Sequence, residues 1–231
     1  MAFIAKDDVA AEFDARGFLV RADVLSEPGC AAVDAELAAL GVRGAGTREL
    51  LVFGWVQDLA QQLRENPVVS SLLRNADCAV QCTYFAKSQS RNWLVALHQD
   101  LSIPVRRRVA DCPCAGWSEK EGTWFCQPPT ELLSNMVAIR VHLDDSTEQN
   151  GPLRVVPGTH RLGRIAPQEA LEHRRRFGEA SCTVARRGIV AMSPLLLHAS
   201  SKSIGSVPRR VLHFAFGPAL LPWGLQWKHA V

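Results

Sequence analysis

The sequence predicts a mainly β fold with flanking α-helices: a double-stranded β-helix of the jelly-roll or cupin-like type, with N-terminal helices packed outside the barrel. Two observations predict it. Residues 1–77 are mostly of helical character, whereas residues 78–231 break into short β-type runs separated by turn residues. Helices first and strands afterwards favour one barrel with helices on its outside. With 231 residues in all, we expect a single domain over 1–231.

The N-terminal part divides at recognisable start and stop residues. The expected elements are a helix over 7–17, a strand over 18–22, a helix over 26–40, and helical turns over 56–75 with a break at Pro67. Ser26 is a good N-cap, and Pro28 fits the first turn of the helix that follows it. Gly41 stops that helix.

The second part contains eight strand-like segments. They are 78–86, 93–105, 136–145, 153–157, 182–186, 188–194, 195–200 and 209–217. Between the second and the third, residues 106–135 are rich in Cys, Pro, Gly and Trp and are expected to form a long loop. A loop of this length in a compact domain is usually functional, so it is a candidate lid. One helix is expected over 166–180, among the later strands.

Composition and charge limit the possible partners. The chain is 47% hydrophobic and contains no apolar run long enough to span a bilayer, and its N-terminus carries acids where a signal peptide would be apolar. A net charge of +3 is too small to indicate nucleic-acid binding. Seven irregularly spaced cysteines suit a reducing cytosol. We therefore expect a cytoplasmic protein that binds a small molecule and neither nucleic acid nor membrane. The sequence does not define the oligomeric state.

Two His-x-Asp triplets are candidate metal sites, His98-Gln99-Asp100 and His142-Leu143-Asp144. Along a strand, residues i and i+2 point to the same face, so His98 and Asp100 would present an imidazole and a carboxylate to one point. His198 is a suitable third ligand. Two histidines and one carboxylate form the facial triad that binds Fe(II) and leaves positions open for substrate and oxygen.

Arg209 lies eleven residues beyond His198, at the start of a predicted strand. A planar guanidinium can hold a carboxylate through two hydrogen bonds. Such a group would suit a dicarboxylate cosubstrate, such as 2-oxoglutarate, whose other end chelates iron.

The chain resembles the phytanoyl-CoA dioxygenase family of Fe(II)/2-oxoglutarate-dependent oxygenases. The resemblance rests on "WLVALHQDLS", "LDDSTEQNGPLRVVPGTH" and "PLLLHASSKSIGSVPRR", in the family's order, and on the N-terminal "EFDARGFLVRADVLSEPGCAAVDAEL". It implies Fe(II), 2-oxoglutarate and O2 as cofactors. It also implies that the iron-binding His-x-Asp triplet precedes the long loop, which selects His98 and Asp100 over the second triplet.

The resemblance further implies residues that contact 2-oxoglutarate: Gln99 and Ser200 beside the ligands, and Thr83 on an earlier strand. Arg210 is the alternative to Arg209 if the register is off by one. His213, on the same strand as Arg209, is expected to be a packed structural histidine.

The segment 139–143 has apolar residues at alternate positions, so Arg140, His142 and Asp144 share its other face, which we expect to turn into the active-site cavity. Arg140 could bind the substrate or the cosubstrate, or could pair with Asp144. Relatives often have an aromatic residue there. Trp117 could close over a substrate or anchor its loop.

The predicted function is a dioxygenase that hydroxylates an unactivated C–H bond of a small molecule and releases succinate and CO2. Related halogenases replace the ligand carboxylate with a small residue, so Asp100 argues against halogenation. One alternative is a cupin-like metalloenzyme that does not use 2-oxoglutarate, and another is a catalytically idle jelly-roll binding protein. The cysteines Cys112, Cys114 and Cys126 do not have the spacing of a common zinc site.

Overall fold

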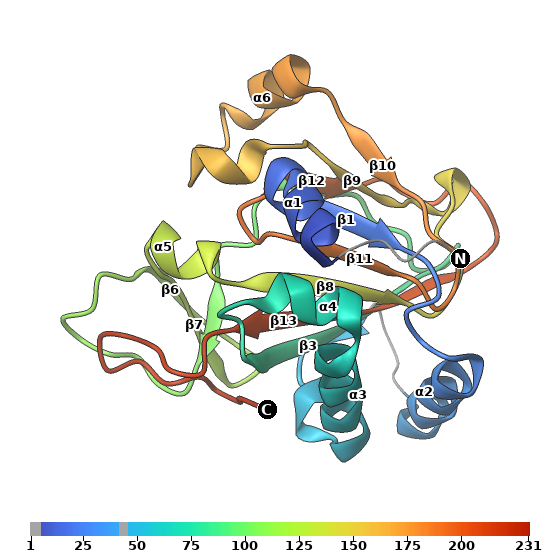
Figure 1. Cartoon of the computed structure of the whole chain (residues 1–231), viewed down its shortest axis with the longest axis horizontal. Coiled ribbons are helices and arrows are strands. Elements are labelled where there is room, and N and C mark those ends of the chain that lie inside the picture. The colour runs from blue at the N-terminus through green and yellow to red at the C-terminus, as the bar shows by residue number, and fades with distance from the viewer. Residues whose placement is uncertain (1–5, 42–45) are drawn as a thin grey trace.

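Two antiparallel sheets face each other and form the predicted jelly-roll-like barrel (Figure 1). The computed structural model describes residues 6–41 and 46–231. The six-stranded sheet has the order β1-β11-β8-β13-β3-β2, and the four-stranded sheet has the order β10-β9-β12-β4. A smaller sheet, β5-β7-β6, extends from one end. The strands are β1 (Phe18–Arg21), β2 (Gly46–Thr47), β3 (Cys78–Lys87), β4 (Val95–His98), β5 (Ile103–Val105), β6 (Ala115–Lys120), β7 (Thr123–Gln127), β8 (Val137–His142), β9 (Leu153–Val155), β10 (Ala180–Cys182), β11 (Ile189–Met192), β12 (His198–Ser200) and β13 (Arg209–Gly217).

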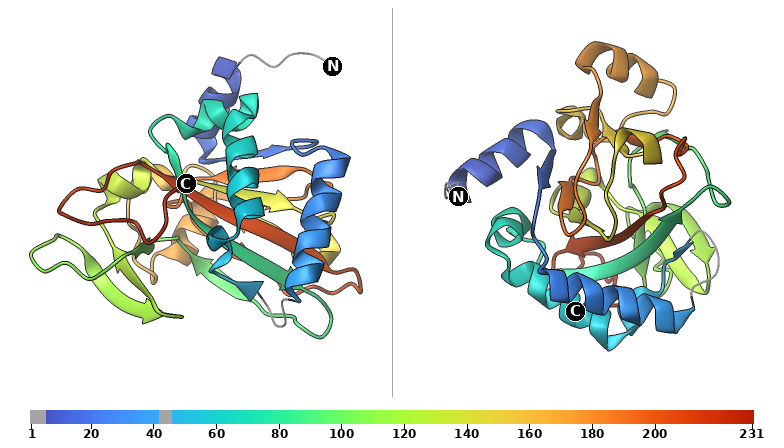
Figure 2. Two further views of the ribbon diagram at one scale, coloured as in Figure 1. Left: turned by 90° about the horizontal axis from the view of Figure 1, so that it is seen from below. Right: turned by 90° about the vertical axis from the view of Figure 1, so that its right-hand side faces the viewer.

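Helices cover the outer face of the six-stranded sheet, as Figure 2 shows for α2, α3 and α4. The helices are α1 (Lys6–Arg16), α2 (Glu27–Leu40), α3 (Gly54–Glu65), α4 (Pro67–Leu73), α5 (Thr130–Ser134) and α6 (Ala170–Phe177), with 3₁₀ turns η1 (Leu50–Val52), η2 (Glu148–Asn150) and η3 (Thr159–Leu162). The largest apolar cluster joins the first four helices to the sheet. Ile139, Val141 and Leu143 belong to it, so the predicted apolar face of this segment is confirmed and is the outward one.

The helix boundaries follow the predicted capping residues. The Ser26 hydroxyl accepts a hydrogen bond from the Gly29 N–H at 3.1 Å, and Pro28 lies in the first turn of α2. Gly41 ends α2 with φ 57°, a left-handed conformation that glycine adopts without a steric penalty. Asn66 separates α3 from α4, and its side chain accepts hydrogen bonds from the first N–H groups of α4.

Four predicted segments differ from the structure. Residues 93–105 are not one strand: β4 ends at His98, and β5 belongs to the small sheet. The predicted long loop 106–135 contains the hairpin β6–β7 and the helix α5. Its first strand is mostly exposed and therefore lacks the apolar alternation by which a strand is recognised. The strands predicted over 182–186 and 195–200 are shorter and shifted.

None of the helices in the described part of the chain is long and apolar enough to cross a membrane.

Candidate metal and cosubstrate site

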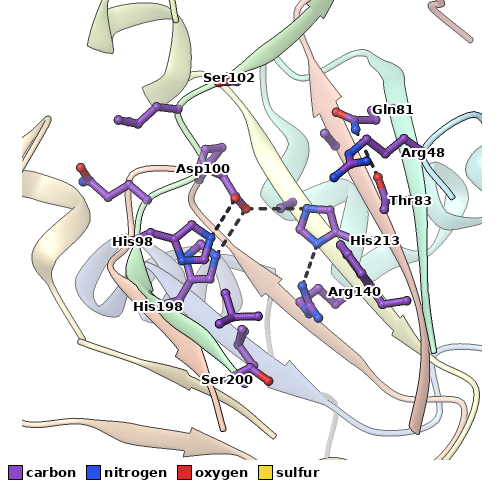
Figure 3. A pocket seen from close by; sticks show the side chains of 18 of the residues that line it. Arg48, Gln81, Thr83, His98, Asp100, Ser102, Arg140, His198, Ser200 and His213 are labelled. Carbon is purple, nitrogen blue, oxygen red and sulfur yellow. Dashed lines mark hydrogen bonds and ion pairs between the residues drawn. The ribbon is translucent and has the colours of Figure 1, made fainter. Parts of the chain in front are cut away.

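His98, Asp100 and His198 meet in the space between the two large sheets (Figure 3). Strands β4 and β12 pair antiparallel with His98 directly opposite His198, which brings the imidazole centroids to 4.2 Å. Asp100 lies beyond the end of β4, where its N–H donates to the Pro194 carbonyl at 2.9 Å. The two residues of the triplet therefore converge through a turn after His98, and not through a shared strand face as predicted.

One potential ligand atom from each of the three side chains lies within 4.8 Å of the others. The Asp100 carboxylate is 3.6 Å from His98 Nε2 and 3.5 Å from His198 Nε2. No other group of three His, Cys, Asp or Glu side chains in residues 6–41 and 46–231 comes together in this way. The donor set of two imidazoles and one carboxylate is the one that suits non-haem Fe(II).

Both imidazoles are oriented by backbone carbonyls. His98 Nδ1 is 2.8 Å from the Ala96 carbonyl, and His198 Nδ1 is 2.9 Å from the Leu196 carbonyl. A carbonyl can only accept, so in the neutral rings Nδ1 carries the proton and the Nε2 lone pairs face Asp100. Metal-binding histidines have this arrangement, with the second ring nitrogen bonded to a carbonyl or carboxylate. The three residues therefore fit a bound metal ion.

The electrostatics favour these forms for His198 and Asp100, whereas in the metal-free site the pKa of His98 is raised, because the effect of burial is outweighed by the nearby Asp100 carboxylate. Burial lowers the pKa of His198 to about 4, so its ring is neutral at physiological pH. Burial by itself would raise the pKa of Asp100, but the nearby imidazoles of His198, His98 and His213 lower it well below its usual range. The site thus offers a carboxylate and a neutral imidazole without prior loss of a proton.

The triad opens into a cavity of about 440 Å³. Its wall on the six-stranded sheet comes from β3, β8 and β13, which lie side by side. Strand register arranges this wall in rows. One row is Lys87 and Arg209, the next includes Phe85, the third is Thr83, His213 and Arg140, and the fourth is Gln81, Ala215 and Ala138.

Lys87 and Arg209, here called the basic pair, are two buried cations on directly opposite positions of β3 and β13. Lys87 is 1% exposed and Arg209 is 4% exposed. Lys87 Nζ donates to Ser200 Oγ at 2.8 Å and to the Ser201 carbonyl at 2.6 Å. Arg209 Nε donates to the Asn150 carbonyl at 3.3 Å, while its Nη1 has no partner. Neither cation forms an ion pair with a described acidic side chain.

Two like charges on opposite strands destabilise a sheet, and burying a cation without a counterion has a further cost. Burial and the neighbouring cations lower the pKa of Lys87 to about 8 and that of Arg209 to about 9. A bound carboxylate would remove both costs. Sequence reasoning missed Lys87, although it occupies the same strand face as Thr83 and Gln81 and ends an otherwise uncharged strand.

Residues 13–211 match the family model described as phytanoyl-CoA dioxygenase (PhyH). The chain belongs to this family. The match spans both the helical part and the barrel. The chain is therefore an enzyme of the iron- and 2-oxoglutarate-dependent oxygenase superfamily, with iron, 2-oxoglutarate and O2 as cofactors. No curated protein matches the sequence.

Solved structures share the fold at low identity. The epimerase SnoN from nogalamycin biosynthesis, in complex with Fe3+, alpha ketoglutarate and nogalamycin RO, is 15% identical with a TM-score of 0.70, covering 93% of this chain and 84% of that one. EctD from S. alaskensis with bound Fe is 17% identical with a TM-score of 0.66, covering 94% and 77%. HygX from Streptomyces hygroscopicus, with nickel and 2-oxoglutarate bound, is 16% identical with a TM-score of 0.65, covering 94% and 88%.

Three further residues, Gln99, Ser200 and Thr83, are expected from the sequence to contact the cosubstrate, and their hydrogen bonds differ from one another. Gln99 uses both amide hydrogens on backbone carbonyls, of Gly163 at 2.8 Å and Leu195 at 2.5 Å, and its oxygen accepts from the Ile165 N–H. Its side chain is thus engaged in holding loops around the site. Ser200 lines the cavity beside Lys87, and Thr83 lines it in the third row, where it accepts a hydrogen bond from Gln81.

Of the alternatives considered for Arg140, the pairing with Asp144 is not formed. Asp144 instead accepts from Arg210 Nε at 2.9 Å and Nη2 at 2.7 Å on the helix side of the sheet, where Arg210 also pairs with Asp34. This arrangement removes Arg210 as an alternative to Arg209. The strand ends at His142, so Asp144 no longer follows the alternation that would place it in the cavity.

Arg140 lines the cavity, whereas His142, two residues along the same strand, is fully buried and has no hydrogen-bond partner for either ring nitrogen. Burial and the nearby arginines lower the pKa of His142 well below its usual value. His142 thus shares the inward face of β8 with Arg140, as expected, but it is not among the residues that line the cavity.

His213 is not the packed structural histidine expected from the sequence. It lines the cavity with Nε2 3.9 Å from Asp100 Oδ2, and its Nδ1 lies 3.1 Å from Arg140 Nη1 (Figure 3). A guanidinium can only donate, so Nδ1 accepts and the Nε2–H of the neutral ring points toward Asp100. Nothing in the local sequence distinguishes this histidine, because only strand register places it opposite Arg140.

Trp117 does not line the cavity. It packs in the apolar cluster of the small sheet, with the Arg108 guanidinium 5.7 Å from its ring centre, while Lys120 and Phe125 are the hairpin residues that reach the cavity wall. Cys112, Cys114 and Cys126 gather in the same cluster. Burial raises the pKa of Cys126 to about 11, which favours the protonated thiol over a metal-binding thiolate.

Proposed function

We propose that the protein hydroxylates an unactivated C–H bond of a small molecule, using iron(II) held by His98, Asp100 and His198 and 2-oxoglutarate held by the basic pair. The observation that carries the proposal is that the metal-binding triad and the basic pair lie on facing sheets of one cavity. The triad lies on the four-stranded sheet and the turn after it, and a buried pair of cations that forms no ion pair with a described acid lies on the facing sheet.

The residues have separate tasks in this proposal. His98 and His198 present their Nε2 atoms because backbone carbonyls fix both rings. Lys87 and Arg209 would bind the far carboxylate of the cosubstrate and so fix its distance from the triad. This positioning contributes to the reaction rate in addition to the affinity, because the rate depends on the geometry of the reacting groups. When bound, iron, 2-oxoglutarate and O2 supply a C–H oxidation coupled to release of succinate and CO2.

Three features support oxygen transfer to a substrate over the alternatives. The carboxylate ligand is retained, which leaves no vacant ligand position for halide. The basic pair would have no purpose in a cupin-like metalloenzyme that does not use 2-oxoglutarate, and an idle binding protein has no need for two oriented imidazoles facing one carboxylate. A cytoplasmic location, which the cysteine content favours, belongs to the same proposal.

The proposal is tested first without oxygen. Fe(II) and then 2-oxoglutarate are added to the wild-type protein, and the weak visible charge-transfer band of the chelate is recorded. Absence of the band refutes the proposal. Asp100→Ala and His198→Ala should abolish the band, and its persistence would show that other residues bind the iron.

The reaction type is tested by product analysis. Candidate small molecules are screened for stimulated succinate release, and the masses of products formed under ¹⁸O2 are measured by mass spectrometry. Hydroxylation predicts one labelled oxygen in each product molecule and one in succinate. A product that has lost two hydrogens, or an isomer of the substrate, would assign desaturation or epimerisation to the same site.

A further inference from the structure

Arg140 is a third buried cation in the cavity, and neither the metal site nor the basic pair uses it. Its side chain is 8% exposed, and it forms no ion pair with any described acid. The protein supplies His213 Nδ1 as one acceptor, at 3.1 Å, and the ring of Phe85 lies 5.6 Å from the guanidinium carbon. The Nε atom is buried without a partner. An arginine has five N–H donors, so most of its capacity is left for a ligand.

The charges of the loaded site also leave Arg140 unpaired. Iron(II) and the dianion of 2-oxoglutarate cancel each other, and Asp100 offsets one of the three cations Lys87, Arg140 and Arg209. Two positive charges would then remain on buried side chains in the cavity wall. Uncompensated buried charge is costly, so a further anion is expected there.

The rows of the cavity wall separate Arg140 from the basic pair. Arg140 and its neighbour His213 lie in the third row, four residues along β13 from Arg209, or about 13 Å at the usual strand rise. His213 faces Asp100, so this row lies opposite the triad. A cosubstrate that extends from the triad toward the basic pair leaves the opposite end of the cavity empty.

Apart from the Gln81 amide, which belongs to the fourth row, that opposite end is lined mainly by small and apolar side chains. The fourth row contributes Ala138 and Ala215, and beyond it the wall continues with Leu133, Met136 and Phe125. Arg140 therefore stands at the boundary between the row that faces the triad and an apolar recess. A ligand that fills this space would have an anionic group beside an apolar part.

We propose that the substrate is a small amphipathic oxyanion, whose carboxylate or phosphate binds Arg140 while its apolar part occupies the recess formed by Leu133, Met136 and Phe125. The inference rests on the proposed function for the place of the cosubstrate. Because Arg140 neighbours the histidine that faces Asp100, the oxidised carbon lies only a few bonds from the anionic group.

Binding at Arg140 can be tested before the substrate is identified. The protein is loaded with Zn(II), a redox-inert substitute for iron(II), and with 2-oxoglutarate, and the Arg140 Nε–H resonance is followed by ¹⁵N NMR. The resonance is assigned by its absence in Arg140→Met. Acetate or inorganic phosphate should shift it with saturation in the millimolar range, and sodium chloride at equal ionic strength should not.

Two outcomes of this titration overturn the inference. If 2-oxoglutarate alone shifts the resonance and neither anion shifts it further, Arg140 belongs to the cosubstrate site. If no anion shifts it, Arg140 is structural. Failure of the proposed function would appear separately, as a missing iron–cosubstrate absorption band, and the anions would then be titrated into the zinc-loaded protein without 2-oxoglutarate.

Turnover gives a second test, with compounds in matched pairs: a carboxylic acid and its amide, and a phosphate ester and its parent alcohol. In the wild type, anionic members should stimulate succinate release at least tenfold more than neutral members. Arg140→Met should remove this preference, Arg140→Lys should keep part of it, and the surface variant Arg175→Met should behave as wild type. Equal stimulation by both members, or a preference that survives in Arg140→Met, contradicts the proposal.

Discussion

Replacing Lys87 by methionine should have opposite effects on the stability of the empty protein and on its affinity for 2-oxoglutarate. The lysine is buried opposite Arg209 and has no partner among the described acidic side chains, so its charge is costly until a carboxylate binds. Methionine has a similar length and no charge. We therefore expect Lys87→Met to stabilise the metal-free, cosubstrate-free protein at neutral pH and to weaken cosubstrate binding.

The magnitude follows from the pKa of Lys87, which is lowered from 10.5 to about 8 by burial and then by Arg209 and Arg140. At about 1.4 kcal/mol per unit, the buried charge costs about 3 kcal/mol of stability at pH 7. Between pH 8 and 10.5 the unfolded chain binds more protons than the folded one, so stability rises with pH and the cost falls below about 1 kcal/mol at pH 10. Methionine loses hydrogen bonds to Ser200 and Ser201, each worth about 1 kcal/mol. Lys87→Met should therefore raise the free energy of unfolding by about 1 kcal/mol at pH 7 and lower it by a similar amount at pH 10.

The assay is urea unfolding of the protein in EDTA at pH 7 and pH 10, with Lys202→Met as an exposed control whose effect should be small at both values. Cosubstrate affinity is measured anaerobically from the Fe(II) chelate band at pH 7. It should fall about tenfold to a hundredfold, because a hydrogen bond to a charged group is worth about 1.5–3 kcal/mol. The reasoning is refuted if Lys87→Met is equally destabilised at both pH values, or if its cosubstrate affinity is that of the wild type.

Three further predictions concern the triad, the basic pair and the hairpin. Asp100→Ala should lower Fe(II) affinity at least tenfold, measured by equilibrium dialysis, and an unchanged affinity would move the metal site elsewhere. Arg209→Met should weaken 2-oxoglutarate binding about tenfold or more in the chelate titration, with little change in iron affinity. Arg210→Met should instead lower the melting temperature, because Arg210 pairs with Asp144 and Asp34. The reverse pattern would contradict the assigned strand faces. Arg48 and Glu121 join β2's end to the β6–β7 turn at 2.6 Å through an exposed ion pair, so Glu121→Gln should change unfolding free energy by less than about 1 kcal/mol. A larger loss in urea unfolding would show that this contact is part of the folding core.

Much of the barrel could be predicted because its strands carry a local signal. Residues 137–142 and 209–217 alternate between two faces, and both strands appear where the pattern places them. The hairpin within 106–135 could not be recognised, since an exposed strand with polar residues on both faces has no apolar period. The predicted strand 93–105 is two strands for a different reason, because the chain leaves one sheet for another after His98.

The sequence by itself determined the residue types that could bind iron and one arginine for a dicarboxylate, because His98, Asp100, His198 and Arg209 occur in a recognisable order. Tertiary structure decided which charges are paired. Asp144 is four residues from Arg140 but binds Arg210 on the other side of the sheet, whereas Lys87 lies opposite Arg209 from over a hundred residues away. Alternation along a strand is a local property of the chain, but compensation of a buried charge depends on every element packed around it. Only the assembled barrel shows three cations facing one carboxylate.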